Sequence, residues 1–244
     1  MKSTTNPSLA ARWKKWGCGY IVPPWSHVAN LEQLLIDTAR HLGQDARLLV
    51  MTVTWLTEHH RLVDVDYLAT LAQKLDDRQS AQLGLLLDMA QEFIGEDVFS
   101  LAMKECRPCR PPRPLYDLDR SRPVLARLAR QQACAASHRW GLWTPPVALK
   151  HDAMRPASWI AANNASFMLR ALLKGDVRSK VIAALSEDGL VEVSETHLTR
   201  RAGCTRRAMH LALENLEASG LIRRCRRGRN YAITLNGKTF PTSL

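Results

Sequence analysis

The chain has 244 residues, 46% of them apolar, so it can bury one large hydrophobic core or two modest ones. Six Cys in a chain of this length exclude a disulfide scaffold. The first residues lack the apolar stretch of a signal peptide, and the longest strongly apolar run, residues 48–56, is too short to span a bilayer. We therefore expect a cytoplasmic protein with reduced thiols and no membrane association.

The net charge of +11 indicates a polyanionic partner, either nucleic acid or an anionic membrane surface. Most of the excess lies late in the chain. Residues 168–244 contain 14 Lys and Arg against 7 Asp and Glu, whereas residues 1–167 contain 20 against 16. Nine Arg lie between Arg200 and Arg229, where the acidic residues are Glu214 and Glu217. The last third is therefore the candidate surface for such a partner.

The first 29 residues are irregular, and a helical pattern begins after them. Apolar residues at helical spacing predict four helices, which start near Asn30, Asp45, Asp64 or Asp66, and Arg78. The second of these is apolar nearly all round, so we expect it to be buried. No segment here alternates with period two. Residues 1–105 are therefore predicted to form a helical N-terminal domain.

Residues 106–158 are rich in Pro and Trp. Four prolines between Cys106 and Tyr116 exclude a helix and favour extended backbone, which indicates a linker or a domain edge. A helix is expected from about Arg122 to Ala136. The Trp-rich residues 137–158 are predicted to pack down as an irregular segment.

Residues 159–244 show a definite order of elements in their last sixty or so positions. A helix over 177–185 is followed by a short strand over 190–193 and a helix over 195–202 with Ser194 as its N-cap. Gly203 makes a tight turn, and Thr205 caps the next helix, which ends near Ser219. Strands over 221–225 and 231–235, joined by a turn at 226–230, complete a hairpin.

This order resembles the winged helix-turn-helix superfamily of prokaryotic transcription regulators. The residues that carry the resemblance are the turn from Leu198 through Ala202 and Gly203 to Thr205, and the run from Leu213 through Leu216 to Gly220-Leu221-Ile222. The resemblance covers about 177–235, a quarter of the chain. The expected fold is mainly α, with a helical N-terminal region and a C-terminal winged helix-turn-helix that carries a small β-hairpin wing.

The resemblance implies that the second helix of the motif enters the major groove of double-stranded DNA and that the hairpin contacts the backbone or the minor groove. The expected contacts are made by Thr205, Arg206, Arg207 and His210 on that helix, by Arg200 and Arg201 on the preceding helix, and by Arg226, Arg227 and Arg229 at the hairpin tip. Arg can bond guanine with two hydrogen bonds, whereas Thr and a helix N-terminus suit phosphate. The alternative interpretation is a solvated basic face.

Other chemistries have little support in the sequence. Cys106 and Cys109 form one Cys-x-x-Cys pair, which only Cys134 and His138 could complete as a zinc site. Cys204 is either a core residue of the turn or a redox-sensitive thiol. No nucleophile motif, phosphate loop or carboxylate pair occurs. We therefore expect no metal, no cofactor and no enzymatic activity.

Together these observations predict a sequence-specific DNA-binding regulator, a repressor or autoregulator that acts as a homodimer on a palindromic operator. The alternative hypothesis is an antitoxin or adaptor whose N-terminal helices bind a partner protein.

Overall fold

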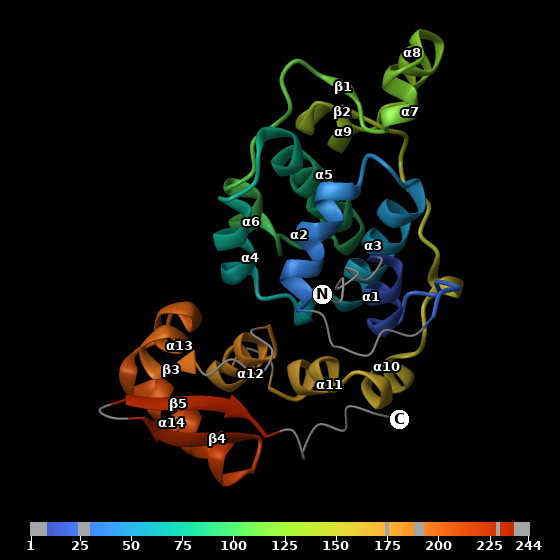
Figure 1. The fold of residues 1–244 in the computed structure, drawn as a ribbon. Helices are drawn as coiled ribbons and strands as arrows, with labels where there is room; N and C mark the ends of the chain where they lie inside the picture. Colours follow the sequence, from blue (N-terminus) through green and yellow to red (C-terminus); the bar gives the residue numbers. More distant parts are fainter. Residues whose placement is uncertain (1–8, 24–29, 174–175, 188–192, 228–229, 237–244) are drawn as a thin grey trace, which may run out of the picture. The chain divides into compact units, whose positions relative to one another are not determined.

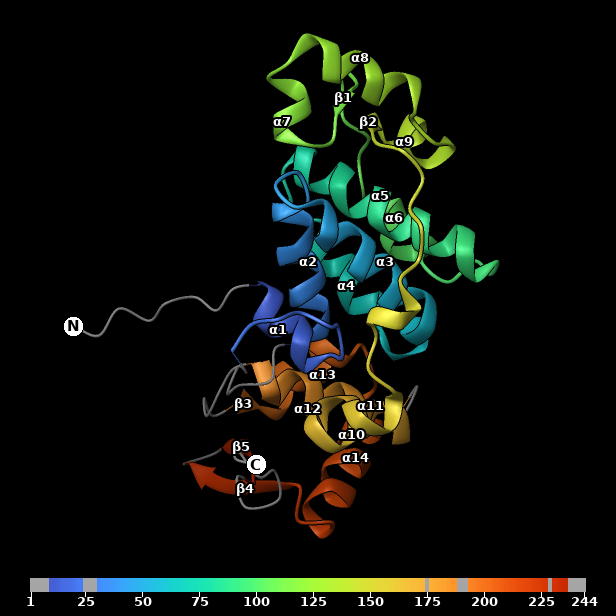
Figure 2. The same ribbon diagram turned by 90° about the vertical axis from the view of Figure 1, so that its right-hand side faces the viewer.

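A computed structural model describes residues 9–23, 30–173, 176–187, 193–227 and 230–236. The protein is mainly helical, with a small three-stranded antiparallel sheet near the C-terminus, as Figures 1 and 2 show. Its contacts group into two compact units. The central unit comprises Cys18–Tyr20 and Leu31–Arg155, and the terminal unit comprises the described residues within Met1–Gly17, Ile21–Asn30 and Pro156–Leu244. Both ends of the chain thus contribute to one unit.

The central unit is built from helices with short connections. Its main helices are α2 (Leu31–His41), α3 (Ala46–His59), α4 (Val65–Ala72) and α5 (Asp77–Ile94). The shorter elements are η1 (His60–Leu62), α6 (Ser100–Lys104), β1 (Arg113–Pro114), α7 (Asp117–Arg120), α8 (Pro123–Gln131), α9 (Ala135–Trp140), β2 (Leu142–Trp143) and η2 (His151–Ala153).

Aspartate N-caps determine where three of the main helices begin. The carboxylates of Asp45, Asp64 and Asp76 accept hydrogen bonds from backbone N–H groups in the first turns of α3, α4 and α5. These bonds satisfy donors that have no partner inside the helix. The predicted start at Asp45 is confirmed, and so is Asp64 of the two predicted alternatives, whereas α5 begins at Asp77, one residue before the predicted Arg78. Capping can be predicted because it depends on residues that are neighbours in the chain.

The core of the central unit lies between α3 and α5. Leu49, Val53 and Trp55 of α3 are buried, as are Leu83, Leu85 and Leu86 of α5. α5 also carries Gly84, where an added Cβ would lie 2.3 Å from a ring carbon of Trp140. The indole of α9 therefore rests directly on the backbone of α5, which no other residue type at position 84 allows without movement.

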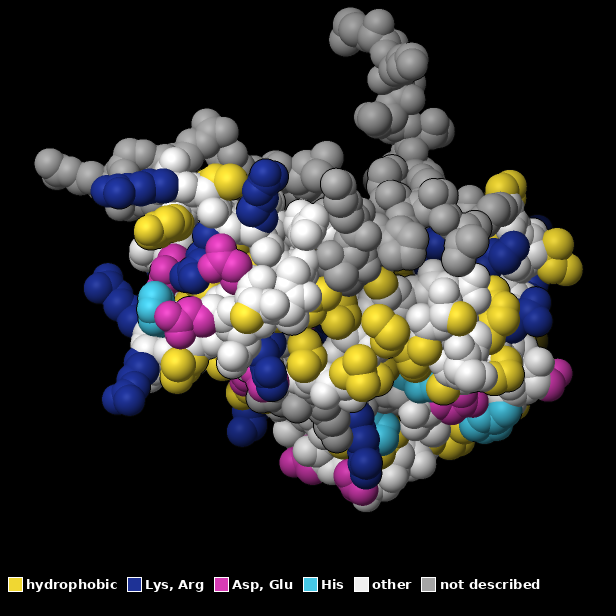
Figure 3. Space-filling view, turned by 90° about the horizontal axis from the view of Figure 1, so that it is seen from below, with side chains coloured by type: hydrophobic (Ala, Val, Ile, Leu, Met, Phe, Trp, Pro, Cys, Tyr) yellow, Lys and Arg dark blue, Asp and Glu magenta, His cyan; other side chains and the backbone are white. Residues whose placement is uncertain are grey.

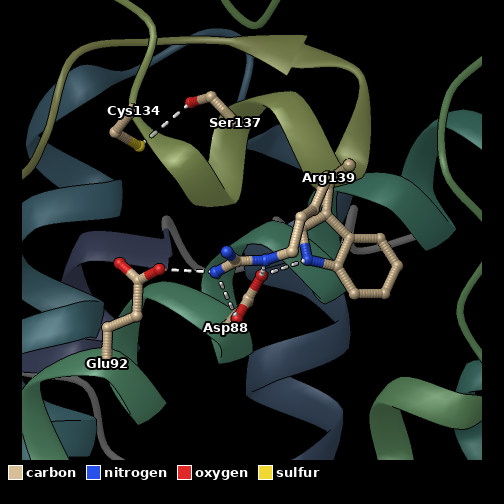
Figure 4. A network of polar contacts seen from close by, with 6 residues as sticks. Asp88, Glu92, Cys134, Ser137 and Arg139 are labelled. Atoms are coloured by element: carbon tan, nitrogen blue, oxygen red, sulfur yellow. Dashed lines mark hydrogen bonds and ion pairs between the residues drawn. The ribbon is translucent and has the colours of Figure 1, made fainter.

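Polar contacts attach α9 to the same helix (Figure 4). Asp88 of α5 accepts hydrogen bonds from Arg139 Nε at 2.7 Å and from Trp140 Nε1 at 2.8 Å. Arg139 also pairs with Glu92 at 2.5 Å, and these carboxylates raise the pKa of its guanidinium. Within α9 itself, the Ser137 hydroxyl lies 3.3 Å from the Cys134 thiol and donates to the carbonyl of Thr144.

The Pro-rich segment after α6 is extended, as predicted, and it packs against the central unit. Cys106 and Cys109 are buried, and Arg107 N–H donates to the hydroxyl of Ser80 at 2.8 Å. β1 pairs in parallel with β2 through Arg113 and Leu142. The contacts thus group residues 106–155 with the helices before them, while the boundaries of the predicted domains 1–105, 106–158 and 159–244 remain predictions.

The terminal unit combines helices with the antiparallel sheet. Its elements are α1 (Leu9–Lys15), α10 (Ala157–Asn163), α11 (Ala165–Leu172), α12 (Val177–Glu187), β3 (Val193–Ser194), α13 (Glu195–Ala202), α14 (Arg206–Ala218), β4 (Ile222–Arg227) and β5 (Asn230–Leu235). The strand order is β3-β5-β4. The order of elements expected between 177 and 235 is present, although residues 190–192 of the predicted first strand lie outside the described residues.

The prediction that the first 29 residues are irregular is wrong for Leu9–Lys15, which form α1. Trp13 of this helix is fully buried. Trp16, which follows the last residue of the helix, packs edge-on against Phe167 of α11, with ring centroids 6.4 Å apart. The backbone carbonyl of Lys15 accepts a hydrogen bond from Asn164 Nδ2. This helix is stabilised by residues about 150 positions away, so its own short sequence carried no clear signal.

In the part of the chain that the structure describes, no helix combines the length and apolar character needed to cross a membrane.

Candidate nucleic-acid interface

One hydrophobic core fixes the position of α13, α14 and the hairpin. It is formed by residues that are each less than a tenth exposed: Leu169, Val181, Ile182, Ala184, Leu185, Val193, Leu198, Ala202, Met209, Leu213, Leu216, Ile222 and Ile233. They come from α11, α12, both helices of the motif and all three strands. Because side chains from every element share this core, the outward faces of α13 and α14 are held in a defined orientation.

Two caps and a glycine shape the turn between α13 and α14. The Ser194 hydroxyl accepts a hydrogen bond from His197 N–H at 3.3 Å, and the Thr205 hydroxyl accepts one from Ala208 N–H at 3.2 Å. Gly203 ends α13 with φ +60°, a left-handed conformation that favours glycine. Cys204 is half-buried against the shared core, which agrees with the core interpretation of this thiol.

The first turn of α14 presents basic side chains to solvent. Thr205, Arg206 and Arg207 are all exposed, and this turn contains no acidic residue. Neither arginine forms a hydrogen bond or an ion pair with any residue in the described ranges. The partial positive charge of the helix N-terminus adds to the two guanidinium charges, so this turn attracts anions.

His210, predicted to contact DNA, lies one turn further along α14 among carboxylates. Its Nε2 is 3.2 Å from Glu214 Oε1, and its Nδ1 is 4.0 Å from Glu195 Oε1. The side chain is 55% exposed. His210 therefore faces solvent beside Arg207, with two carboxylates close to its ring. Their negative charge repels a phosphate, whereas it suits contact with a hydrogen-bond donor on a base.

Neighbouring arginines of β4 have different surroundings. Arg224 donates to Glu217 Oε2 of α14 from Nε at 2.6 Å and from Nη2 at 2.5 Å, and its side chain is 18% exposed. Arg223 and Arg226 are exposed and make no such pair with a described residue. Arg224 thus holds the strand against the helix, whereas the other two remain available to a ligand.

The predicted turn at 226–230 is wrong at both ends. Arg226 and Arg227 belong to β4, where they pair with Tyr231 and Asn230 of β5. The antiparallel ladder extends further than the sequence indicates, because backbone pairing across the two strands includes Arg226, Arg227 and the turn-forming residue Asn230. Gly228 and Arg229 of the predicted tip lie outside the described residues.

The two arginines of α13 also differ. Arg200 is exposed, with no partner among described side chains. Arg201 is half-buried, and its Nη1 donates to the carbonyl of Ala184 in α12 at 3.4 Å. The sequence treats the two as equivalent, yet the helix turns them by about 100° relative to each other, so that Arg201 faces its own unit.

Figure 3 shows the result on one face of the molecule. Lys and Arg side chains project at the left, the side on which α13, α14 and the hairpin lie in Figure 1, with a few acidic side chains and a histidine between them. Sequence reasoning missed two exposed residues of β4 and α14, namely Arg223 and the 53% exposed Leu211. Arg223 directly follows the buried Ile222, and because successive side chains of a strand alternate faces, this would have indicated that Arg223 points outward.

The other predicted candidates give no competing site. No group of three or more His, Cys, Asp and Glu side chains within the described ranges is arranged to hold a metal ion. The Cys106 thiol donates to the carbonyl of Ala102 at 3.4 Å, and burial raises its pKa to about 12. That thiol is therefore a neutral core group at physiological pH.

Comparisons of this chain with protein-family models, with curated proteins and with solved structures found no match.

Proposed function

We propose that the chain is a sequence-specific DNA-binding regulator that uses a winged helix-turn-helix formed by α12, α13, α14 and the β4–β5 hairpin. The observation that carries this proposal is the first turn of α14, where Arg206 and Arg207 are exposed beside the N-cap Thr205 and pair with no described residue. We take α14 as the helix that enters the groove because one of its faces is buried in the shared core, while Arg206 and Arg207 at its N-terminus are exposed.

Duplex DNA suits this surface better than other polyanions do. A single helix fits the major groove, where arginine can bond two acceptors of guanine. The exposed Arg200, Arg223 and Arg226 lie on elements flanking α14 and would bond phosphates on either side of the groove. Glu195 and Glu214 disfavour indiscriminate phosphate binding around His210 and so support selectivity for base edges.

We further propose that the protein acts as a homodimer on a palindromic operator, as a repressor or autoregulator. A single module of this size contacts few base pairs, and pairing two modules multiplies both affinity and selectivity.

The test is fluorescence anisotropy with a duplex from the region upstream of the gene, measured across a salt series. Arg206→Ala/Arg207→Ala should weaken specific binding about 100-fold and reduce the salt slope by about 2. The matched control is Arg122→Ala/Arg127→Ala, which removes the same charge from exposed positions in the central unit and should change affinity less than about threefold. Equal losses in both variants would show that the basic charge acts without a defined site and would overturn the proposal.

A further inference from the structure

A second group of arginines lies in the central unit. Arg78 is the second residue of α5, Arg113 lies in β1, and Arg120 ends α7. Residues 107–139, which include β1 and α7, contain eight Arg against two Asp. Elements far apart in sequence are joined here: Asp117 N–H donates to the carbonyl of Gly43 at 3.0 Å, and Arg113 N–H donates to that of Gly141 at 3.1 Å.

A single carboxylate oxygen holds two of these guanidinium groups together. Oδ1 of Asp117 pairs with Arg78 Nη2 at 2.6 Å and also with Arg120 Nη2. Arg113 has no such counter-ion among the described side chains, yet its charge acts on both of the others. With Asp76 as the other carboxylate that faces Arg78, the positive charges outnumber the negative ones.

The donors of this cluster are not fully used. The Nε atoms of Arg78, Arg113 and Arg120 are all buried, and none has a hydrogen-bond partner within the described ranges. Buried N–H groups without acceptors are rare in folded proteins, and three in one cluster call for an acceptor that the described residues do not provide. Burial lowers the pKa of Arg78 and Arg120, and neighbouring guanidinium charges lower it further. An anion would relieve both effects.

We propose that Arg78, Arg113 and Arg120 form a binding site for the phosphate group of a small molecule. Guanidinium groups bond phosphate oxygens through parallel N–H donors, and the several oxygens of a phosphate can accept from three such groups at once. Arg78 lies in the first turn of α5, where the carboxylate of Asp76 already caps the helix N-terminus, so the guanidinium groups supply the attraction for the anion.

The partly covered position of the cluster favours a small molecule over a nucleic-acid backbone. The side chains of Arg78 and Arg120 are 34% and 22% exposed, so neighbouring atoms cover most of each side chain. Gly43 lies directly under the cluster, since an added Cβ would be 2.6 Å from Arg78 Nη2. A duplex, by contrast, is bound mainly by side chains that protrude into solvent.

The test measures binding of inorganic phosphate and of pyrophosphate to the full chain by calorimetry and thermal melting, against sodium chloride at equal ionic strength. We expect a rise in Tm with phosphate beyond that with chloride, and a single saturable site. Arg113→Gln should weaken phosphate binding at least about tenfold. Because Arg113 has no counter-ion to lose, the same variant should melt no lower than the wild type without phosphate. Arg122→Gln, an exposed change of equal charge, should bind phosphate as the wild type does.

Arg113→Lys is the second variant, since it keeps the charge and removes the fork of donors, and it should also lose affinity. Equal effects of phosphate and chloride, or unchanged phosphate binding in Arg113→Gln, would overturn the proposal. So would a result in which Arg113→Gln weakens binding of duplex DNA alone. Loss of DNA binding in the α14 variants leaves the phosphate site unaffected. A failure of the phosphate-site proposal can therefore be distinguished from a failure of the proposed DNA-binding function.

Discussion

Arg139 in the central unit and Arg206 in the terminal unit carry the same guanidinium group in opposite surroundings. Arg139 bonds two carboxylates of α5 and ties α9 to that helix. Arg206 is exposed at the start of α14 and has no partner among the described residues. A paired arginine stabilises its own fold, whereas an unpaired one on a rigid helix can give its hydrogen bonds to a ligand. Under the proposed function, pairing rather than the number of charges separates the structural Arg139 from Arg206.

The largest expected effect on stability comes from disturbing the packing of α9, which carries the paired Arg139, on α5. Gly84→Ala would normally favour a helix, yet here the new Cβ meets the ring of Trp140. We expect a loss of about 3 kcal/mol in the free energy of unfolding, measured by urea denaturation. The double variant Gly84→Ala/Trp140→Leu should recover part of that loss. A stability gain in the single variant would show that α9 does not rest on α5.

Asp88→Ala sharpens the comparison by breaking the structural network at its centre. It removes the acceptor of both Arg139 and Trp140, leaving the partly buried indole N–H unpaired. The expected loss of stability is about 2 kcal/mol. Glu92→Ala is the control, because Glu92 is 47% exposed and bonds Arg139 alone, and its cost should stay below about 0.5 kcal/mol. Similar losses in the two variants would contradict this assignment.

Thr205→Ala tests whether the free arginines depend on the helix that presents them. Loss of the hydroxyl leaves Ala208 N–H without its cap, so stability should fall by about 1 kcal/mol. Thr205→Ser keeps the bond and should restore it. If DNA binding is carried by this turn, Thr205→Ala should also weaken it in the anisotropy assay, while Thr205→Ser should not.

The smallest expected effects on stability come from replacing Arg224 and Arg223, which are neighbours in β4. Arg224→Ala breaks the pair with Glu217 and should cost less than about 1 kcal/mol, since the carboxylate is partly exposed. Arg223→Ala should leave stability unchanged and weaken binding of duplex DNA about tenfold. Thermal melting and anisotropy on the same two proteins separate the roles. The opposite pattern would mean that exposure does not identify the binding arginines.

Local patterns explain why the C-terminal elements were predicted closely. Ser194, Gly203 and Thr205 act on residues within four positions, so α13 and α14 begin and end where their caps require. The apolar spacing of Met209, Leu213 and Leu216 likewise identified the buried face of α14 correctly.

Features that depend on distant residues were missed. α1 owes its stability to contacts with α11, and the arginines of β4 were misplaced into a turn because strand pairing is decided across the ladder. The separation of Arg201 from Arg200, and of Arg224 from Arg223, required the positions of Ala184 and Glu217.

By itself, then, the sequence determined the mainly helical composition, the order of elements near the C-terminus and the concentration of arginine there. Only the tertiary structure decided which arginines are paired, that segments from both halves of the chain join one unit, and that Arg113 lies near Arg78 and Arg120, which share Asp117. The physical reason is range: capping and periodicity act within one or two helical turns, whereas ion pairing and burial depend on residues that meet only when the chain folds.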